Sequence, residues 1–307
     1  MSLHVRPPPA RPASLDDVLR AILERSAPPR AWSLVVTIFG DAIGPRGGSL
    51  WLGTLNEIAD AFGIGEGVVR TAMSRLAADG WVERQRVGRN SYYRLTPQAM
   101  EETDAASRVI YAPAPGGWSH QWTLAVIAGE DKRARSERRT LLRHAGFGRL
   151  GPDLFVAPSP VRDAQALGGR AGFVFEDCAS LGPEGDRRLA AGAWPLDELA
   201  ASYRRFVETF KPVASQLDRR RAPPERASVA LRLLLIHELR RIVLRDPGLP
   251  VEIVGADWPG RAARALAKDV WHGLLAPSET WLDRNGRGID GPLPAPSAAL
   301  GRRFGGT

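Results

Sequence analysis

The amino-acid sequence predicts an α+β protein of more than one domain, and three observations support this fold class. The chain has 307 residues, whereas one domain usually takes roughly 100 to 200. Helical periodicity alternates with strand-like stretches as far as residue 194, and long helical patterns follow from Pro195. Hydrophobic residues make up 44% of the chain and charged residues 25%, which is typical of a folded globular protein.

Charge and cysteine content narrow the class of protein. The formal net charge of +8 favours a polyanionic partner such as nucleic acid. This signal is weak alone, because only Lys132, Lys211 and Lys268 are lysines and a GC-rich genome also produces such an arginine bias. Cys178 is a single cysteine, which excludes an internal disulfide and a cysteine-cluster zinc site. Without an apolar run of roughly 18 residues or a secretory signal, we expect a cytoplasmic protein that does not contact the membrane.

The N-terminal extension, residues 1–30, is predicted to be a proline-rich tail that carries one short helix. The clusters RPPPARP and APPR flank the stretch from Ser14 to Arg25. Apolar residues recur in that stretch at helical spacing, namely Leu15, Val18, Leu19 and Ile22.

Residues 31–97 are predicted to form a core helix, a helix-turn-helix pair and a β-hairpin. An apolar stripe indicates the core helix over residues 31–43. The next helix lies in TLNEIADAFG, where Thr54 can be the N-cap and Glu57 can complete a capping box. A further helical pattern then ends at Gly80. Finally, the strand-like WVERQR and SYYRL flank VGRN, whose glycine and asparagine suit a tight turn.

The last helix of this region has a polar outer face that suits the major groove of DNA. Its apolar residues Val69, Ala72, Met73 and Leu76 fall on one side, so two guanidinium groups and two hydroxyl groups point away. Arginine can bridge the O6 and N7 acceptors of guanine, and the arginines of the hairpin can bind phosphates beside the helix. The predicted DNA-binding residues are Arg70, Thr71, Ser74, Arg75, Arg84, Arg86, Arg89, Asn90 and Tyr92.

An arginine-rich hairpin alone is more often a solvated surface than a nucleic-acid site. The order of the elements makes a nucleic-acid site the better-supported interpretation here. A capped helix, a short turn, a second helix with a polar outer face and a basic hairpin follow one another directly. This succession is typical of a winged helix-turn-helix, so the sequence favours DNA binding.

The remaining chain divides where the composition changes. Residues 98–117 are predicted to be a helix and a Pro/Gly linker. Residues 118–194 are predicted to be an α+β middle domain with strands in WTLAVIAG, DLFVAP and GFVFEDC. Residues 195–282 are predicted to be a helical C-terminal domain, and residues 283–307 a flexible tail. The helices expected in these segments are Ser136–His144, Leu196–Phe210, Ser228–Arg245 and Gly260–Leu275, the last three bounded by proline or glycine.

The helix at 228–245 carries a candidate effector site for an anion. His237, Arg240 and Arg241 fall on one side of it, at i, i+3 and i+4. The alternative, which is the more common case, is that these groups pair with nearby polar residues and fasten helices together.

Motifs of enzymes are missing, because there is no P-loop, GIGEG follows a helix instead of a strand, and His237-Glu238 lacks a second zinc-binding histidine. We therefore expect no catalysis and no bound cofactor or metal.

Four stretches carry a family resemblance. They are SLVVTIFGDAIGPRGGSLWLG, VVRTAMSRLAADGWVERQRVGRNSYYRLT, GFGRLGPDLFVAPSP and LLIHELRRIVLRDPGLPVEIVGADWPGRAAR, and the resemblance covers roughly residues 31–282. The chain resembles the PaaX family of phenylacetic acid degradation operon repressors. This resemblance implies a winged helix, a ferredoxin-like middle domain and a helical C-terminal domain. It also implies a homodimer that represses aromatic catabolism genes and releases operator DNA when an aryl-CoA thioester, typically phenylacetyl-CoA, binds.

One stretch departs from the family pattern. GGWSHQWTL keeps Trp118 and Trp122 but has Ser119 and His120 where the family has Trp-Asp-Gly-x-Trp. This difference leaves the acyl group of the effector open.

Two other functions are also open. The middle domain could be a metal-dependent nuclease or a CoA-ester hydrolase, with Asp131, Asp153, Glu176 and Asp177 as metal ligands, although their spacing forms no motif. The winged helix could instead contact another protein, and the chain would then show little salt-dependent affinity for DNA. Metal-dependent turnover and salt-dependent DNA binding distinguish these two functions from a DNA-binding repressor.

Overall fold

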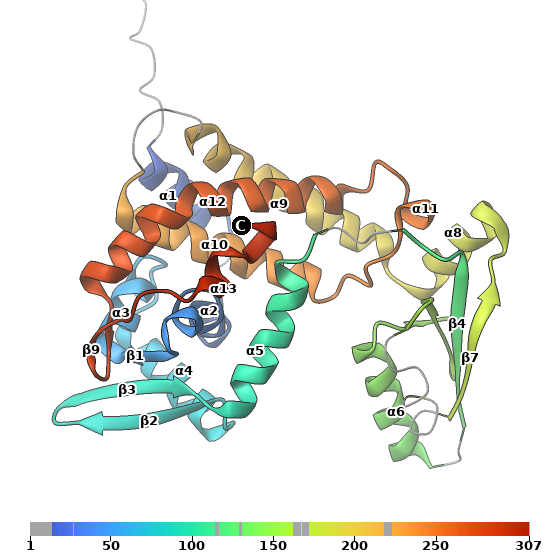
Figure 1. Cartoon of the computed structure of the whole chain (residues 1–307), viewed down its shortest axis with the longest axis horizontal. Coiled ribbons are helices and arrows are strands. Elements are labelled where there is room, and N and C mark those ends of the chain that lie inside the picture. The colour runs from blue at the N-terminus through green and yellow to red at the C-terminus, as the bar shows by residue number, and fades with distance from the viewer. Residues whose placement is uncertain are drawn as a thin grey trace, which may run out of the picture. The chain divides into compact units, whose positions relative to one another are not determined.

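The structure is a computed structural model that describes residues 14–26, 28–113, 117–128, 131–161, 167, 172–217 and 223–306. The chain divides into two compact units (Figure 1). Unit 1 takes residues 1–112, 207–240 and 265–307, and unit 2 takes residues 113–206 and 241–264. Residues 1–13 of the predicted proline-rich extension, and residue 27, lie outside the described residues. Every helix in the described ranges is too short or too polar to cross a lipid bilayer.

The N-terminal part of unit 1 is a group of helices beside an antiparallel sheet. Its described residues form three strands in the order β1-β3-β2, with β2 and β3 as the predicted hairpin. Strand β1 was not predicted. The elements are α1 (Leu15–Arg25), α2 (Ala31–Ile38), the π-helical turn η1 (Phe39–Ile43), the 3₁₀ turn η2 (Gly44–Arg46), β1 (Ser49–Trp51), α3 (Leu52–Asp60), α4 (Glu66–Ala78), β2 (Val82–Val87), β3 (Asn90–Leu95) and α5 (Pro97–Ile110).

Two helices of this region differ from the prediction. The predicted core helix over residues 31–43 stops being α-helical at Ile38 and continues as the π turn η1. The helix α3 begins at Leu52, so Thr54 lies inside it and does not cap it. The hydroxyl of Thr54 instead donates a hydrogen bond to the backbone oxygen of Asn285 at 3.2 Å. A contact with a distant part of the chain therefore decides the role of this threonine.

The long helices continue past the prolines that were expected to end them. Helix α9 passes Pro212, and α12 passes Pro277. A proline inside a helix removes one backbone hydrogen bond, and Val213, next to Pro212, is buried. The helices are α9 (Leu196–Leu217), α10 (Glu225–Val243), α11 (Val251–Val254) and α12 (Pro259–Asn285).

The two units do not follow the predicted segments. Helices α9, α10 and α12 each contribute residues to both units, so residues 195–282 are not one separate body. Residues 283–306 are ordered by packing, because the apolar side chains of Leu293, Leu300 and Phe304 are buried. They form a packed part of unit 1 instead of the loose tail that their composition indicates. The elements are β8 (Arg287–Gly288), β9 (Gly291–Pro292), α13 (Ala298–Gly301) and the 3₁₀ turn η3 (Arg303–Gly305).

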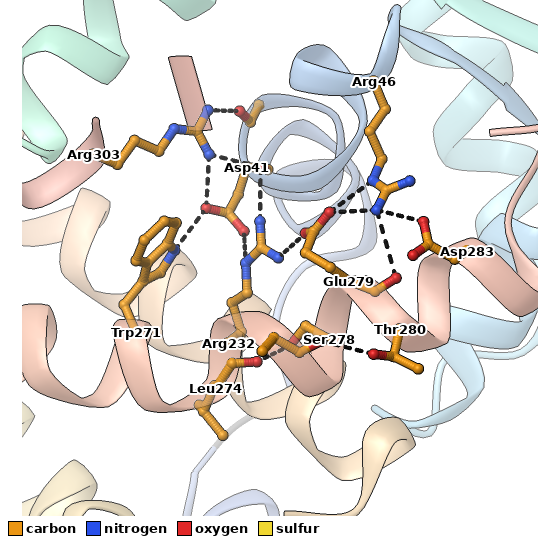
Figure 2. A network of polar contacts seen from close by, with 12 residues as sticks. Asp41, Arg46, Arg232, Trp271, Leu274, Ser278, Glu279, Thr280, Asp283 and Arg303 are labelled. Carbon is orange, nitrogen blue, oxygen red and sulfur yellow. Dashed lines mark hydrogen bonds and ion pairs between the residues drawn. The ribbon is translucent and has the colours of Figure 1, made fainter. Parts of the chain in front are cut away.

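A buried carboxylate lies at the centre of a charged network in unit 1 (Figure 2). Asp41, in the turn η1, is 1% exposed. The Nε of Arg232 is 2.7 Å from its Oδ2, and Nη1 of Arg303 is 3.1 Å from its Oδ1. Tyr111 and Trp271 donate hydrogen bonds to the same Oδ1 at 2.6 Å and 3.2 Å. Burial raises the pKa of Asp41, but the two guanidinium groups and these hydrogen bonds outweigh it, so the pKa lies below its ordinary value.

The network continues to a second carboxylate. Glu279, on α12, pairs with Arg232 and also lies 2.5 Å from Nη2 of Arg46. Asp283, one turn further along α12, is 2.8 Å from the same nitrogen of Arg46. These ion pairs connect η1, η2, α10, α12 and the C-terminal segment (Figure 2).

Unit 2 contains an antiparallel sheet with helices on both faces. Its described strands lie in the order β5-β6-β4-β7. On one face Leu142 of α6 packs with Phe155, and on the other Ala190 of α8 packs with Trp122 and Val156. The elements are β4 (Gln121–Ile127), α6 (Lys132–His144), β5 (Gly148–Arg149), β6 (Leu154–Pro158), β7 (Gly172–Ala179) and α8 (Gly182–Ala193).

Candidate nucleic-acid interface

Helix α4 has one buried face and one exposed face, as its periodicity predicts. The apolar residues Val69, Ala72, Met73 and Leu76 are all buried. Contacts with α2 and α3 provide the surface against which they pack. The helix ends at Ala78 with Asp79 as its C-cap, and Gly80 follows with a φ of +71°, a conformation that favours glycine. The polar side of α4 is therefore fixed toward solvent by the packing of its apolar side.

The four predicted α4 residues lie on that exposed side. Arg70, Thr71, Ser74 and Arg75 are all exposed. Arg75 is 3.7 Å from Asp79, but the two side chains are 72% and 61% exposed, so this ion pair holds the guanidinium only weakly. The hydroxyl of Thr71 donates to the backbone oxygen of Gly67 at 3.0 Å. Its oxygen remains an acceptor that a base or an ordered water can use.

The basic hairpin follows α4 closely and extends beyond the helices (Figure 1). Val87 pairs with Asn90, which leaves Gly88 and Arg89 as the turn. Gly88 has a φ of +60°, which a two-residue hairpin turn requires at this position. The side chain of Arg89 is exposed at the tip of the hairpin. The guanidinium at the tip can therefore reach phosphates or enter a groove.

The pairing register divides the other hairpin residues between two faces. Arg84 lies opposite Tyr93 and Arg86 opposite Ser91, so these arginines share the face on which Tyr93 is buried. Arg84 donates hydrogen bonds to the hydroxyl of Ser91 at 2.9 Å and 3.2 Å. Arg86 donates to the backbone oxygen of Gly88 at 3.2 Å. Short local contacts therefore hold both guanidinium groups along the hairpin.

Asn90 and Tyr92 lie on the opposite face of the hairpin. The alternation along β3 places them with Arg94, and Gln85 lies directly opposite Tyr92. Asn90, Gln85 and Arg94 are exposed, and Tyr92 is half-buried. The predicted hairpin residues therefore form two surfaces joined at Arg89. Gln85 was missed by sequence reasoning, and the two-residue period of β2 is the signal that places it beside Tyr92.

The three candidate effector residues lie on α10, and two of them have contacts with α2. His237 is buried, and its Nδ1 is 3.1 Å from the hydroxyl of Thr37. Arg240 donates to the hydroxyl of Ser33 at 2.8 Å and to its backbone oxygen at 3.1 Å. Arg241 is exposed and belongs to unit 2, whereas the other two belong to unit 1. These contacts fasten α10 to α2, and the effector role of the three residues stays a prediction.

The carboxylates considered as metal ligands have other roles or lie apart. Asp131 caps α6 by accepting hydrogen bonds from two backbone amides. Asp153 pairs with Arg135 and Arg139, and the hydrogen bond from Arg135 holds the pKa of Asp153 below its ordinary value. Among the described residues there is no group of three His, Cys, Asp or Glu side chains that could hold a metal ion.

The departure from the family pattern lies at the start of β4. The ring of His120 is 5.1 Å from that of Trp118, and Trp118 contacts Trp122 at 5.2 Å. His120 has a φ of +58°, which is uncommon for a residue other than glycine. Ser119 donates a hydrogen bond to the backbone oxygen of Ser159 at 3.1 Å.

An exposed polar helix face and a cationic hairpin are features of proteins that bind polyanions. Comparison with known proteins gives the family. The model of the PaaX-like protein family matches residues 30–99, and that of the PaaX-like protein C-terminal domain matches residues 194–284. The chain is 34% identical over 291 residues to the transcriptional repressor PaaX of Escherichia coli (strain K12), and the match covers 92% of each chain. The chain therefore belongs to the PaaX family.

A solved structure is also similar in part. The uncharacterized protein Rv0674 from Mycobacterium tuberculosis shares 23% sequence identity with this chain, with a TM-score of 0.48. The similarity covers 73% of this chain and 88% of that one.

Proposed function

We propose that this chain is a DNA-binding transcriptional repressor. Helix α4 contacts the bases of its operator, and the β2–β3 hairpin binds the adjacent phosphate backbone of the DNA. The observation that carries the proposal is the exposure of Arg70, Ser74 and Arg75 on α4 next to a hairpin with Arg89 at its tip. Four or more guanidinium groups on neighbouring elements suit a duplex, because arginine binds both guanine edges and phosphates. The 34% identical relative, whose name is transcriptional repressor PaaX, supports the same function.

The fold that we propose for this chain is a winged helix-turn-helix with a ferredoxin-like middle domain. Helices α3 and α4 are the helix-turn-helix pair, and the hairpin with β1 is the wing. The antiparallel strand order β5-β6-β4-β7 supports the ferredoxin-like arrangement. A homodimer is also part of the proposal. Two copies of α4 would then meet half-sites about 34 to 36 Å apart, or a multiple of that distance.

Two arginine variants test the DNA interface. The operator is first obtained by selecting bound fragments from genomic DNA. On that operator, Arg75→Ala should cost about 1 to 3 kcal/mol at one base position, because it removes a contact to a base. Arg89→Ala should weaken binding to all sequences alike and lower the salt slope by about 1, because it removes a contact to a phosphate. Arg20→Ala, on the exposed side of α1, is the matched control. If both interface variants bind as the control does, this surface is not the DNA site.

The proposed effector is an aryl-CoA thioester such as phenylacetyl-CoA, and the genes under control are those of aromatic acid catabolism. The effector must have a higher affinity for the form of the protein that does not bind operator DNA. A ligand with equal affinity for both forms does not shift the equilibrium between them. Saturating phenylacetyl-CoA should therefore raise the melting temperature of the free protein and weaken operator binding. If neither quantity changes, phenylacetyl-CoA is the wrong ligand, and a panel of other aryl-CoA esters is tested next.

A further inference from the structure

We infer that helix α6 of unit 2 carries a second DNA-contact surface, which binds phosphates outside the bases read by α4. The inference rests on the proposed function, because it concerns a further contact of a DNA-binding protein. The surface consists of Lys132, Arg133 and Arg143, and we call it the α6 basic face. Nothing in the sequence analysis assigned a role to these residues.

The charge of α6 is unusually one-sided for a surface helix. Its sequence KRARSERRTLLRH contains six lysine and arginine residues against one glutamate. The excess is local to this helix, because residues 172–206 of the same unit contain more acidic than basic residues. A like-charged helix face destabilises its own fold, and binding of a polyanion removes that repulsion.

The packing of α6 directs its basic face to solvent. Leu142 is fully buried against the sheet, with Leu141 and Ala145 packed beside it. The opposite side of the helix carries Lys132 and Arg143 at i and i+11, three turns apart, and both are exposed. At a rise of about 1.5 Å per residue this side is roughly 16 Å long, which spans several phosphates of one DNA strand.

The basic residues of α6 differ in how firmly other side chains hold them. Arg135 and Arg139 both pair with Asp153 and so hold the helix to the β5–β6 region. Arg133 is 3.1 Å from Glu137, but its side chain is 88% exposed, and such surface pairs contribute little. In the described part of the chain the ion pairs of α6 involve neither Lys132 nor Arg143, and Arg143 donates a hydrogen bond to the hydroxyl of Thr140 at 3.3 Å. Three cationic side chains can therefore bind a ligand, and no buried contact has to break.

Salt dependence of DNA binding tests the inference directly. The triple variant Lys132→Ala/Arg133→Ala/Arg143→Ala is titrated with a mixed-sequence duplex of about 40 base pairs at several salt concentrations. Each phosphate contact contributes about 0.9 to the slope of log K against log salt, so the slope should fall by about 2 to 3. The sequence preference measured by fragment selection should not change, because phosphates carry no base identity. The variant Lys132→Arg/Arg133→Lys/Arg143→Lys keeps the charge and should keep the slope.

Three exposed arginines elsewhere in unit 2 provide the matched control. Arg187→Ala/Arg188→Ala/Arg204→Ala changes the net charge by the same amount and should leave the slope within 1 of the wild type. An equal fall in both triple variants, or no fall in either, overturns the inference. If the wild-type protein itself shows no salt-dependent duplex binding, the proposed function fails as well. If the wild type binds and the α6 variant has the same slope, only the second contact surface is refuted.

Discussion

Replacement of Asp41 by asparagine should destabilise unit 1 more than any change on its surface. The substitution keeps the shape of the side chain but removes the charge that faces Arg232 and Arg303. Arg232 is 1% exposed, so it cannot recover hydration, and Glu279 would be the carboxylate left beside it among the described residues. The Oδ2 of Asp41 and Nε of Arg232 meet as an ion pair without a well-aligned hydrogen bond, so the loss is mainly one of charge attraction.

The magnitude follows from the burial of both partners. Breaking a buried ion pair by removing one partner typically costs about 3 to 5 kcal/mol, because an uncompensated charge remains in the interior. Domains are typically stable by only about 5 to 15 kcal/mol, so Asp41→Asn should remove a large fraction of the stability of unit 1. Urea unfolding followed by far-ultraviolet circular dichroism measures the difference in free energy.

An exposed ion pair of the same unit provides the control for this prediction. Asp60 lies 2.8 Å from Arg226, and their side chains are 74% and 58% exposed. Asp60→Asn should therefore cost less than about 1 kcal/mol. If Asp41→Asn unfolds within about 1 kcal/mol of the wild type, buried charge does not stabilise this unit and the reasoning is refuted.

Two further predictions concern acid stability and α10. The folded pKa of Asp41 lies below its ordinary value of 3.8, so its contribution is complete above that value and is lost as the pH falls through the folded pKa. Urea midpoints of the wild type should therefore fall more steeply between about pH 5 and about pH 2 than those of Asp41→Asn. Arg240→Ala should lower the free energy of unfolding by about 1 to 3 kcal/mol, because Ser33 loses a charged hydrogen bond. The predicted effector role of Arg240 requires in addition that phenylacetyl-CoA raise the melting temperature of this variant less than that of the wild type; an equal rise would contradict that role.

Local patterns were enough to predict the elements of the candidate interface. The apolar period of Val69, Met73 and Leu76 determines which side of α4 is buried, and the structure places those residues in the core. The turn of the hairpin was predictable as well, because only glycine takes the backbone conformation of Gly88 without strain. Such signals lie within a few residues of one another, so one sequence contains them completely.

Contacts between distant residues could not be predicted in this way. Thr54 has the sequence context of a helix cap, but its partner is Asn285, which lies far along the chain. The two faces of the hairpin depend on the pairing of Arg84 with Tyr93, and a shift by one residue would exchange them. The positive charge of α6 is evident from the sequence. Which of its arginines are available to a ligand depends on which ones pair with Asp153 in the structure.

The bond between Arg303 and Asp41 joins residues that are 262 positions apart. During translation, Asp41 leaves the ribosome 262 residues before this partner does. The charged network around Asp41 is thus begun early and completed late, whereas the sheet of unit 2 can close while synthesis continues. A nascent chain should therefore acquire full affinity for its target only after Arg303 has left the ribosome.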